Sequence, residues 1–248
     1  MRDSCRLMAA GGVALVLIAL AATPARAVVP GQVDDFESGS VLNWQNSSTV
    51  LDPPPATPPH PGIARNIATG GPAGANDNFL QIGSSGGSGP GSKLVVFNLA
   101  QWTGNYLDQG INAIQMHVNN TGATDLTLRL LLVSGPAGAA QTLCTVADVD
   151  VPDASGWQLV TFPLTAANLQ AGPGSDFATV MGNVTELNLA YGADPFFLRS
   201  ESPPIVAQLG FDNVTAVAVP EPSVLGVAGA GVFAAAALRR GRRTRACK

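Results

Sequence analysis

Hydrophobic and polar residues alternate with a period of two through the middle of the chain. In "INAIQMHVNN", Ile114, Met116 and Val118 fall on one side and polar residues fall on the other. The alternation recurs in "DLTLRLLLVSG", "WQLVTFPL" and "VTELNLAYG". Shorter apolar segments bounded by turn residues are "FLQIG", "SKLVVFNL" and "IVAQLGFDNVTAV". Because side chains alternate between the two faces of a β-strand, the pattern predicts about ten short antiparallel strands.

No stretch of this region has a convincing helical period. Many short strands separated by Gly, Pro, Asn and Asp predict an all-β fold, an antiparallel two-sheet β-sandwich of the jelly-roll type. Two irregular segments interrupt the strands. "LDPPPATPPHPG" is expected to form a surface loop, because proline cannot occupy a central strand, and "GSSGGSGPGS" is expected to be a flexible connector.

The N-terminus has the organisation of a signal peptide. Basic residues precede an apolar stretch at 7–22, and Ala25-Arg26-Ala27 follows as an A-x-A cleavage site. This pattern predicts a signal peptide over 1–27 and a mature domain that begins at Val28 and extends over 28–217. The alternative is an uncleaved anchor helix. The apolar stretch is short for a membrane span, which argues against this alternative.

The C-terminal tail, 218–248, has three parts in a fixed order. A proline-bracketed motif is followed by an apolar segment at 223–238 and a basic end at 239–248, whose arginines are Arg239, Arg240, Arg242, Arg243 and Arg245. The segment is apolar on every face, which predicts a short transmembrane helix with the arginines on the cytoplasmic side. The alternative is a weakly apolar helix packed on the domain.

This order of motif, apolar helix and arginines resembles the PEP-CTERM sorting signal of Gram-negative bacteria, with the motif at Val219, Pro220, Glu221 and Pro222. The resemblance implies an exosortase as a processing partner, a membrane-embedded cysteine protease-transpeptidase that cuts near Pro-Glu-Pro. It also implies a transient anchor in the inner membrane. After processing, the protein is expected at the cell surface or in the extracellular biofilm matrix.

The two ends of the middle region resemble a second family. "DDFESGSVLNWQN" and "GFDNVTAV" are similar to the edges of carbohydrate-binding-module jelly rolls of the galactose-binding-like superfamily. The resemblance implies adjacent first and last strands and a structural calcium ion held by Glu37 and Asp212, with Asp35 as a further candidate. Calcium takes six to eight oxygen ligands, which carboxylates and carbonyls supply. The alternative is that these acids are exposed residues at a strand edge.

The composition and charge of the chain limit the classes of molecule expected to bind it. Charged residues make up 12% of the chain, and the formal net charge is −4. Five arginines lie at 239–245, which leaves the middle of the chain acidic. Because phosphate binding needs a basic surface, we expect no nucleic-acid partner. Cys144 is the only cysteine within 28–217, so this region forms no internal disulfide, and the pattern assigns no role to Cys144 or Cys247.

Some side chains of the predicted strands are candidates for carbohydrate contact, namely Trp102, Gln115, His117 and Arg129. The other tryptophans, Trp44 and Trp157, could stack on sugar rings in the same way. Polar positions of neighbouring strands, including Glu186 and Asn188, could share one outer sheet surface with the candidates. Two alternatives stay open: tryptophan at a strand end often belongs to the core, and a polar sheet face often only meets water.

The chain lacks the common catalytic motifs. It has two histidines, no G-x-S-x-G elbow and no H-E-x-x-H pair. We therefore expect a non-enzymatic exported protein whose β-sandwich binds exopolysaccharide. Two other functions remain open, a structural surface protein that associates with itself and a polysaccharide-active enzyme that uses Glu186 or another acid.

Overall fold

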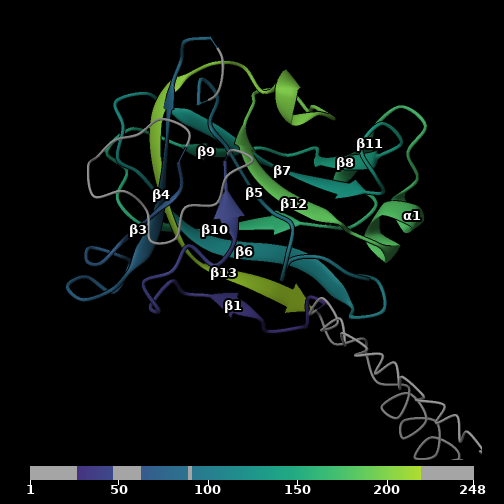
Figure 1. Ribbon diagram of the computed structural model, residues 1–248, viewed down its shortest axis with the longest axis horizontal. Coiled ribbons are helices and arrows are strands. Elements are labelled where there is room, and N and C mark those ends of the chain that lie inside the picture. The colour runs from purple at the N-terminus through teal and green to yellow at the C-terminus, as the bar shows by residue number, and fades with distance from the viewer. Residues whose placement is uncertain (1–26, 47–62, 89–90, 219–248) are drawn as a thin grey trace, which may run out of the picture.

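The computed structural model describes residues 27–46, 63–88 and 91–218. The sorting motif, the apolar and basic parts of the tail, the proline-rich loop and the apolar part of the signal peptide lie outside these ranges. Within the ranges, no helix is long and apolar enough to cross a membrane. The described residues form two antiparallel sheets that pack face to face (Figure 1).

Sheet A contains six strands in the order β10-β6-β13-β4-β3, with β1 also paired to β13. Its strands are β1 (Val33–Asp34), β3 (Arg65–Ile67), β4 (Phe79–Ser85), β6 (Ile111–Asn120), β10 (Gln158–Pro163) and β13 (Val206–Ala218). The first and last strands of the domain are thus neighbours, which confirms the expectation drawn from its two ends. Figure 1 shows β1 beside β13 at the lower edge of the view.

Sheet B contains seven strands in the order β11-β8-β7-β12-β5-β2, with β9 also paired to β7. Its strands are β2 (Trp44–Gln45), β5 (Val95–Asn98), β7 (Leu126–Ser134), β8 (Gln141–Thr145), β9 (Val149–Val151), β11 (Leu169–Ala171) and β12 (Glu186–Tyr191). Two short helices complete the described chain, the α-helix α1 (Phe177–Gly182) and the 3-10 helix η1 (Arg199–Glu201).

The connectivity is that of a jelly roll. Strand β13 lies between β4 and β6 in sheet A, and β12 lies between β5 and β7 in sheet B. The chain therefore winds between the sheets in two Greek keys, with every pair antiparallel. The predicted two-sheet sandwich is confirmed.

Alternation along the strands builds the core between the sheets. The leucines at 126, 128, 130 and 132 of β7 face sheet A and are at most 1% exposed, as the pattern predicted. Ile114, Met116 and Val118 of β6 meet them from the other side. Full burial of each such side chain contributes about 1.5–3 kcal/mol. Helix in the described residues is confined to α1 and η1, as an all-β fold implies, and α1 begins where the Asp176 side chain accepts from the Thr179 amide.

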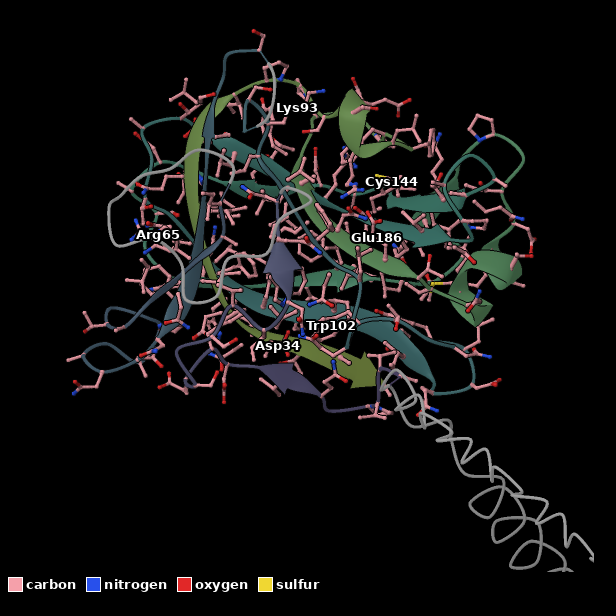
Figure 2. All side chains as sticks on the ribbon, in the orientation of Figure 1. Asp34, Arg65, Lys93, Trp102, Cys144 and Glu186 are labelled. Atoms are coloured by element: carbon pink, nitrogen blue, oxygen red, sulfur yellow. The ribbon has the colours of Figure 1, made fainter. Side chains whose placement is uncertain are left out.

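A buried carboxylate fastens β1 to the core. Oδ2 of Asp34 accepts hydrogen bonds from Trp102 Nε1 at 2.6 Å, Trp44 Nε1 at 2.7 Å and Gln101 Nε2 at 2.9 Å. Burial, the leading cause, raises the pKa of Asp34, while the three donors act in the opposite direction. Figure 2 shows Asp34 and Trp102 close together in the lower part of the sandwich. Segments far apart in the sequence are thereby joined at one oxygen atom.

Candidate functional site

The outer surface of sheet A carries a band of polar side chains, which we call the polar face: Arg65, Gln81, Gln115, His117, Asn119 and Trp157. Register places them side by side, because Arg65 pairs with Gln81, and both Gln81 and Asn119 pair with Gly210. Directly opposed residues of antiparallel strands project from the same side of the sheet. The band therefore crosses the sheet from its β3 edge to the start of β10.

Trp157 crosses the centre of the polar face. Gly210 makes room for it: a Cβ atom there would lie 3.0 Å from Phe79 Cε2 and 3.2 Å from Trp157 Cη2. The rings of Phe79 and Trp157 meet edge to face, with centroids 5.2 Å apart. The indole Nε1 donates to the Gly70 carbonyl at 2.8 Å, which fixes the ring in place. Trp157 remains partly exposed, so the face has an aromatic platform among polar groups.

Some nitrogen atoms of the polar face are buried and lack a partner. Nε and Nη1 of Arg65 and Nδ1 of His117 make no hydrogen bond to any residue that the structure describes. Buried polar groups in proteins are normally paired with protein or water, so these atoms are groups that a ligand could satisfy. Gln115 differs, since its Nε2 donates to Thr161 Oγ1 at 3.1 Å.

Two of the predicted sugar contacts need correction. Trp102 is fully buried and donates to Asp34, so no sugar ring reaches it in this structure. The same holds for Trp44. Of the three tryptophans, Trp157 is the partly exposed one, which alternation alone did not distinguish from the other two.

Arg129 is the second correction. Its side chain is 4% exposed on the outer side of sheet B, where it is 3.3 Å from Asp148 Oδ2. The guanidinium also donates to four carbonyl oxygens, those of Thr145, Val146, Gly192 and Ala193. Arg129 is thus a structural cross-link.

The polar positions of the two sheets do not share one surface, because Gln115 and His117 belong to sheet A whereas Arg129, Glu186 and Asn188 belong to sheet B.

Carboxylates gather beside the polar face at a β-bulge. The register of β13 shifts after Asp212, where Asn213 has a φ of 52°. Asp212 is 1% exposed, and burial is the leading cause that raises its pKa to about 7. The charges of Asp77, Glu37 and Asp35 raise it further, and the Asn213 amide lowers it. A buried acid among like charges is a costly arrangement unless a cation or a proton compensates it.

The carboxylates suit calcium in their chemistry, as hard oxygen donors with no basic side chain paired to them among the described residues. Their present contacts are with the protein itself. Glu37 Oε1 accepts from the Asn78 amide at 2.8 Å, and Asp212 accepts both donors of Asn213. Within the described ranges, no three acidic, His or Cys side chains converge as a metal group. The donor types therefore fit calcium, and the structure does not show the assembled site.

Replacing Asp212 by asparagine should change the pH dependence of stability. The folded-state pKa lies above the unfolded value of 3.8, so ionisation destabilises the fold increasingly as the pH rises from about 4 to about 7. In a chelating buffer, Asp212→Asn should be more stable than the unmodified protein near pH 8 by up to roughly 4 kcal/mol and show no such gain near pH 4. Urea unfolding at both pH values measures this difference.

The exposed acid Asp194 provides the control, since Asp194→Asn removes the same charge without a buried environment. A gain for Asp212→Asn that is equal at both pH values would contradict the assignment.

The outer side of sheet B bears a hollow with a volume of about 440 Å³. Its walls include Leu131, Val133 and Phe197. At its rim Arg199 Nε lies 3.1 Å from Glu186 Oε1, and the guanidinium carbon lies 3.8 Å from the centre of the Phe97 ring. Glu186 Oε1 has this ion pair but no hydrogen bond among the described residues, and no other side-chain polar atom of the hollow's lining is buried without a partner. The hollow therefore offers fewer such groups than the polar face, which has two on Arg65 and one on His117.

Comparison with known proteins found no matching family model and no matching curated protein. Among solved structures, the family 11 carbohydrate-binding module from Clostridium thermocellum in complex with a β-1,3-1,4-mixed-linked tetrasaccharide aligns with 78% of this chain and 99% of its own, at 13% identity and a TM-score of 0.47. The CBM22-1 xylan-binding domain from Paenibacillus barcinonensis Xyn10C aligns with 77% of this chain and 99% of its own, at 12% identity and a TM-score of 0.40.

An exo-β-agarase aligns with 77% of this chain, at 13% identity and a TM-score of 0.49, and the match covers 26% of that enzyme's chain. With TM-scores below 0.5 and low identities, these likenesses assign neither a family nor a ligand to this protein.

Proposed function

We propose that the polar face binds carbohydrate and that the domain is a non-catalytic binding module. The observation that carries this proposal is the partly exposed Trp157 ring, fixed across Gly210 and flanked by the unpartnered nitrogens of Arg65 and His117. A pyranose ring presents an apolar C–H face and an edge of hydroxyl groups. An aromatic platform supports the former, and amide, imidazole and guanidinium groups pair with the latter.

Replacing Trp157 by alanine should weaken binding by about thirtyfold or more, because an aromatic anchor at the centre of an interface commonly contributes about 2 kcal/mol or more to affinity. The measurement is affinity electrophoresis against immobilised polysaccharides, followed by calorimetric titration of those that retard the protein. A thermal melt of the variant establishes that it is folded.

Phe197→Ala is the matched control, since Phe197 is a partly buried aromatic residue that lines the hollow on sheet B. It should bind glycan like the unmodified protein. If Phe197→Ala weakened binding and Trp157→Ala left it intact, the site would lie on sheet B and the proposal for the polar face would be wrong.

Calcium is proposed as a structural ion rather than a reactant. Asp212, with Glu37 and Asp35, would hold it through carboxylate oxygens, and its charge would offset the burial and the carboxylate repulsion that raise the pKa of Asp212. A calcium-dependent rise in melting temperature that Asp212→Asn abolishes supports this ion. Equal melting with calcium and with chelator would exclude it.

Export and sorting are proposed from the two ends of the chain. Cleavage between Ala27 and Val28 and recognition of Val219–Pro222 by an exosortase would deliver the domain to the cell surface or the extracellular matrix, where exopolysaccharide is available. Intact mass measurement of the exported protein tests both steps. A C-terminus still at Lys248 would contradict the processing.

A further inference from the structure

The basic side chains of the described residues are four: Arg65, Lys93, Arg129 and Arg199. Three of them have partners. Arg129 and Arg199 form ion pairs with Asp148 and Glu186, and Lys93 donates to the Ser200 carbonyl. Arg65 makes no hydrogen bond or ion pair within the described part of the chain, and its Nε and Nη1 are shielded from solvent.

An arginine without an ion pair or a hydrogen bond is unusual in a domain with an excess of acidic residues. The charges of Asp35, Glu37 and Asp77 act on Asp212 at the neighbouring bulge, yet none of these four carboxylates is within ion-pair distance of Arg65. A shielded guanidinium without a counter-charge carries a desolvation cost that a bound anion would offset. The fork of N–H groups matches the two oxygens of a carboxylate or a sulfate.

The position of Arg65 places that charge on the polar face. It opposes Gln81 across the β3–β4 pair, and Gln81 opposes Gly210, over which Trp157 lies. Cross-strand neighbours lie about 5 Å apart, so the guanidinium is within a few sugar-ring lengths of the indole. A glycan chain that stacks on Trp157 can therefore present a substituent to Arg65.

From this we infer that the glycan bound by the polar face carries an anionic group, which pairs with the Arg65 guanidinium. The inference rests on the proposed carbohydrate-binding function and specifies its ligand class as acidic polysaccharide. The anion is a uronate carboxylate or a sulfate ester, two sources of one chemistry that the experiment separates.

The test uses matched polymers: polygalacturonate with its carboxyl-reduced form, and dextran sulfate with dextran. The unmodified protein should bind an acidic member more tightly than its neutral counterpart by about tenfold to a hundredfold, the range expected for a hydrogen bond to a charged group. That preference should shrink as salt is added. The polymer pair that shows it identifies the carboxylate or the sulfate.

Arg65→Gln should lose the preference, so that its affinity for the acidic polymer falls to its affinity for the neutral member of the pair. Arg65→Lys, which keeps the charge without the fork, should retain part of it. Lys93→Gln is the matched control for net charge; Figure 2 shows Lys93 and Arg65 at different edges of the molecule, and this variant should keep the full preference.

Two failures are distinguishable. If the neutral polymers bind as well as the acidic ones, or if Arg65→Gln weakens both members of a pair equally, the acidic class is wrong, and sensitivity to Trp157→Ala still supports the polar face. If no member of either pair binds, or if Trp157→Ala has no effect on binding, the inference fails together with the proposed function.

Discussion

Replacing Asp34 by alanine is expected to lower the free energy of unfolding by about 3–5 kcal/mol. The carboxylate is 5% exposed, and one of its oxygens accepts from two indoles and one amide. Truncation would leave the two buried indole N–H groups without their acceptor, while Gln101 Nε2 keeps the Leu42 carbonyl, and each unsatisfied buried donor costs about 1–3 kcal/mol. Urea unfolding followed by tryptophan fluorescence measures the loss directly, because Trp44 and Trp102 are the affected donors.

The adjacent acid provides the control. Asp35 is exposed, and its Oδ1 accepts only from the Glu37 amide at 3.3 Å among its described contacts. In a chelating buffer, Asp35→Ala should change stability by less than about 1 kcal/mol. Equal losses for the two variants would show that the Asp34 contacts do not anchor β1.

Arg129→Ala is the second large loss, also about 3–5 kcal/mol, because one truncation removes the donor for four carbonyl groups and leaves Asp148 unpaired. Two of the carbonyls belong to Gly192 and Ala193, which begin the segment that packs over sheet B. Hydrogen exchange should therefore accelerate around 192–203 as well as at the strand ends. Thermal or urea unfolding gives the total loss.

Arg199→Ala is the control for Arg129→Ala. It also forms an ion pair, but its side chain is 41% exposed. Arg199→Ala should cost less than about 1 kcal/mol, as is typical of exposed pairs. If Arg129→Ala cost no more than Arg199→Ala, the cross-link would not hold the segment to the sheet.

The long strands could be predicted because each has enough residues to show a period of two. "INAIQMHVNN" coincides with β6. The alternating leucines of "DLTLRLLLVSG" lie in β7 and all face the core between the sheets. Strands of two or three residues, such as β1, β3 and β9, have no period to detect. They exist because the adjacent sheet edge offers unpaired backbone groups, which is a tertiary cause.

The residues of the candidate site were harder to predict from the sequence, because their positions depend on which strands pair. Alternation identifies the two sides of each strand, yet it does not say which strands share a sheet. His117 and Arg129 both occupy polar positions of predicted strands, and the jelly-roll winding puts them on opposite sheets. Arg65 was missed because β3 is three residues long.

The sequence also did not distinguish the core tryptophans from the partly exposed one. Trp102 and Trp157 both precede a strand, and only the distant Asp34 makes the first a core residue. The glycine within β13 was a usable signal, since glycine inside a strand often marks a close approach by another group. Here the approaching group is the Trp157 ring over Gly210.

The central claim is that glycan contacts Trp157 on the polar face, and the three indole N–H groups of the chain test it most directly. The chain has three tryptophans, so a nitrogen-15 correlation spectrum should show three indole signals. Titration with an oligosaccharide of a retained glycan should shift the Trp157 signal in proportion to saturation. The signals of Trp44 and Trp102, both bonded to Asp34 in the core, should stay in place. Saturable binding that leaves the Trp157 signal unmoved would contradict the account.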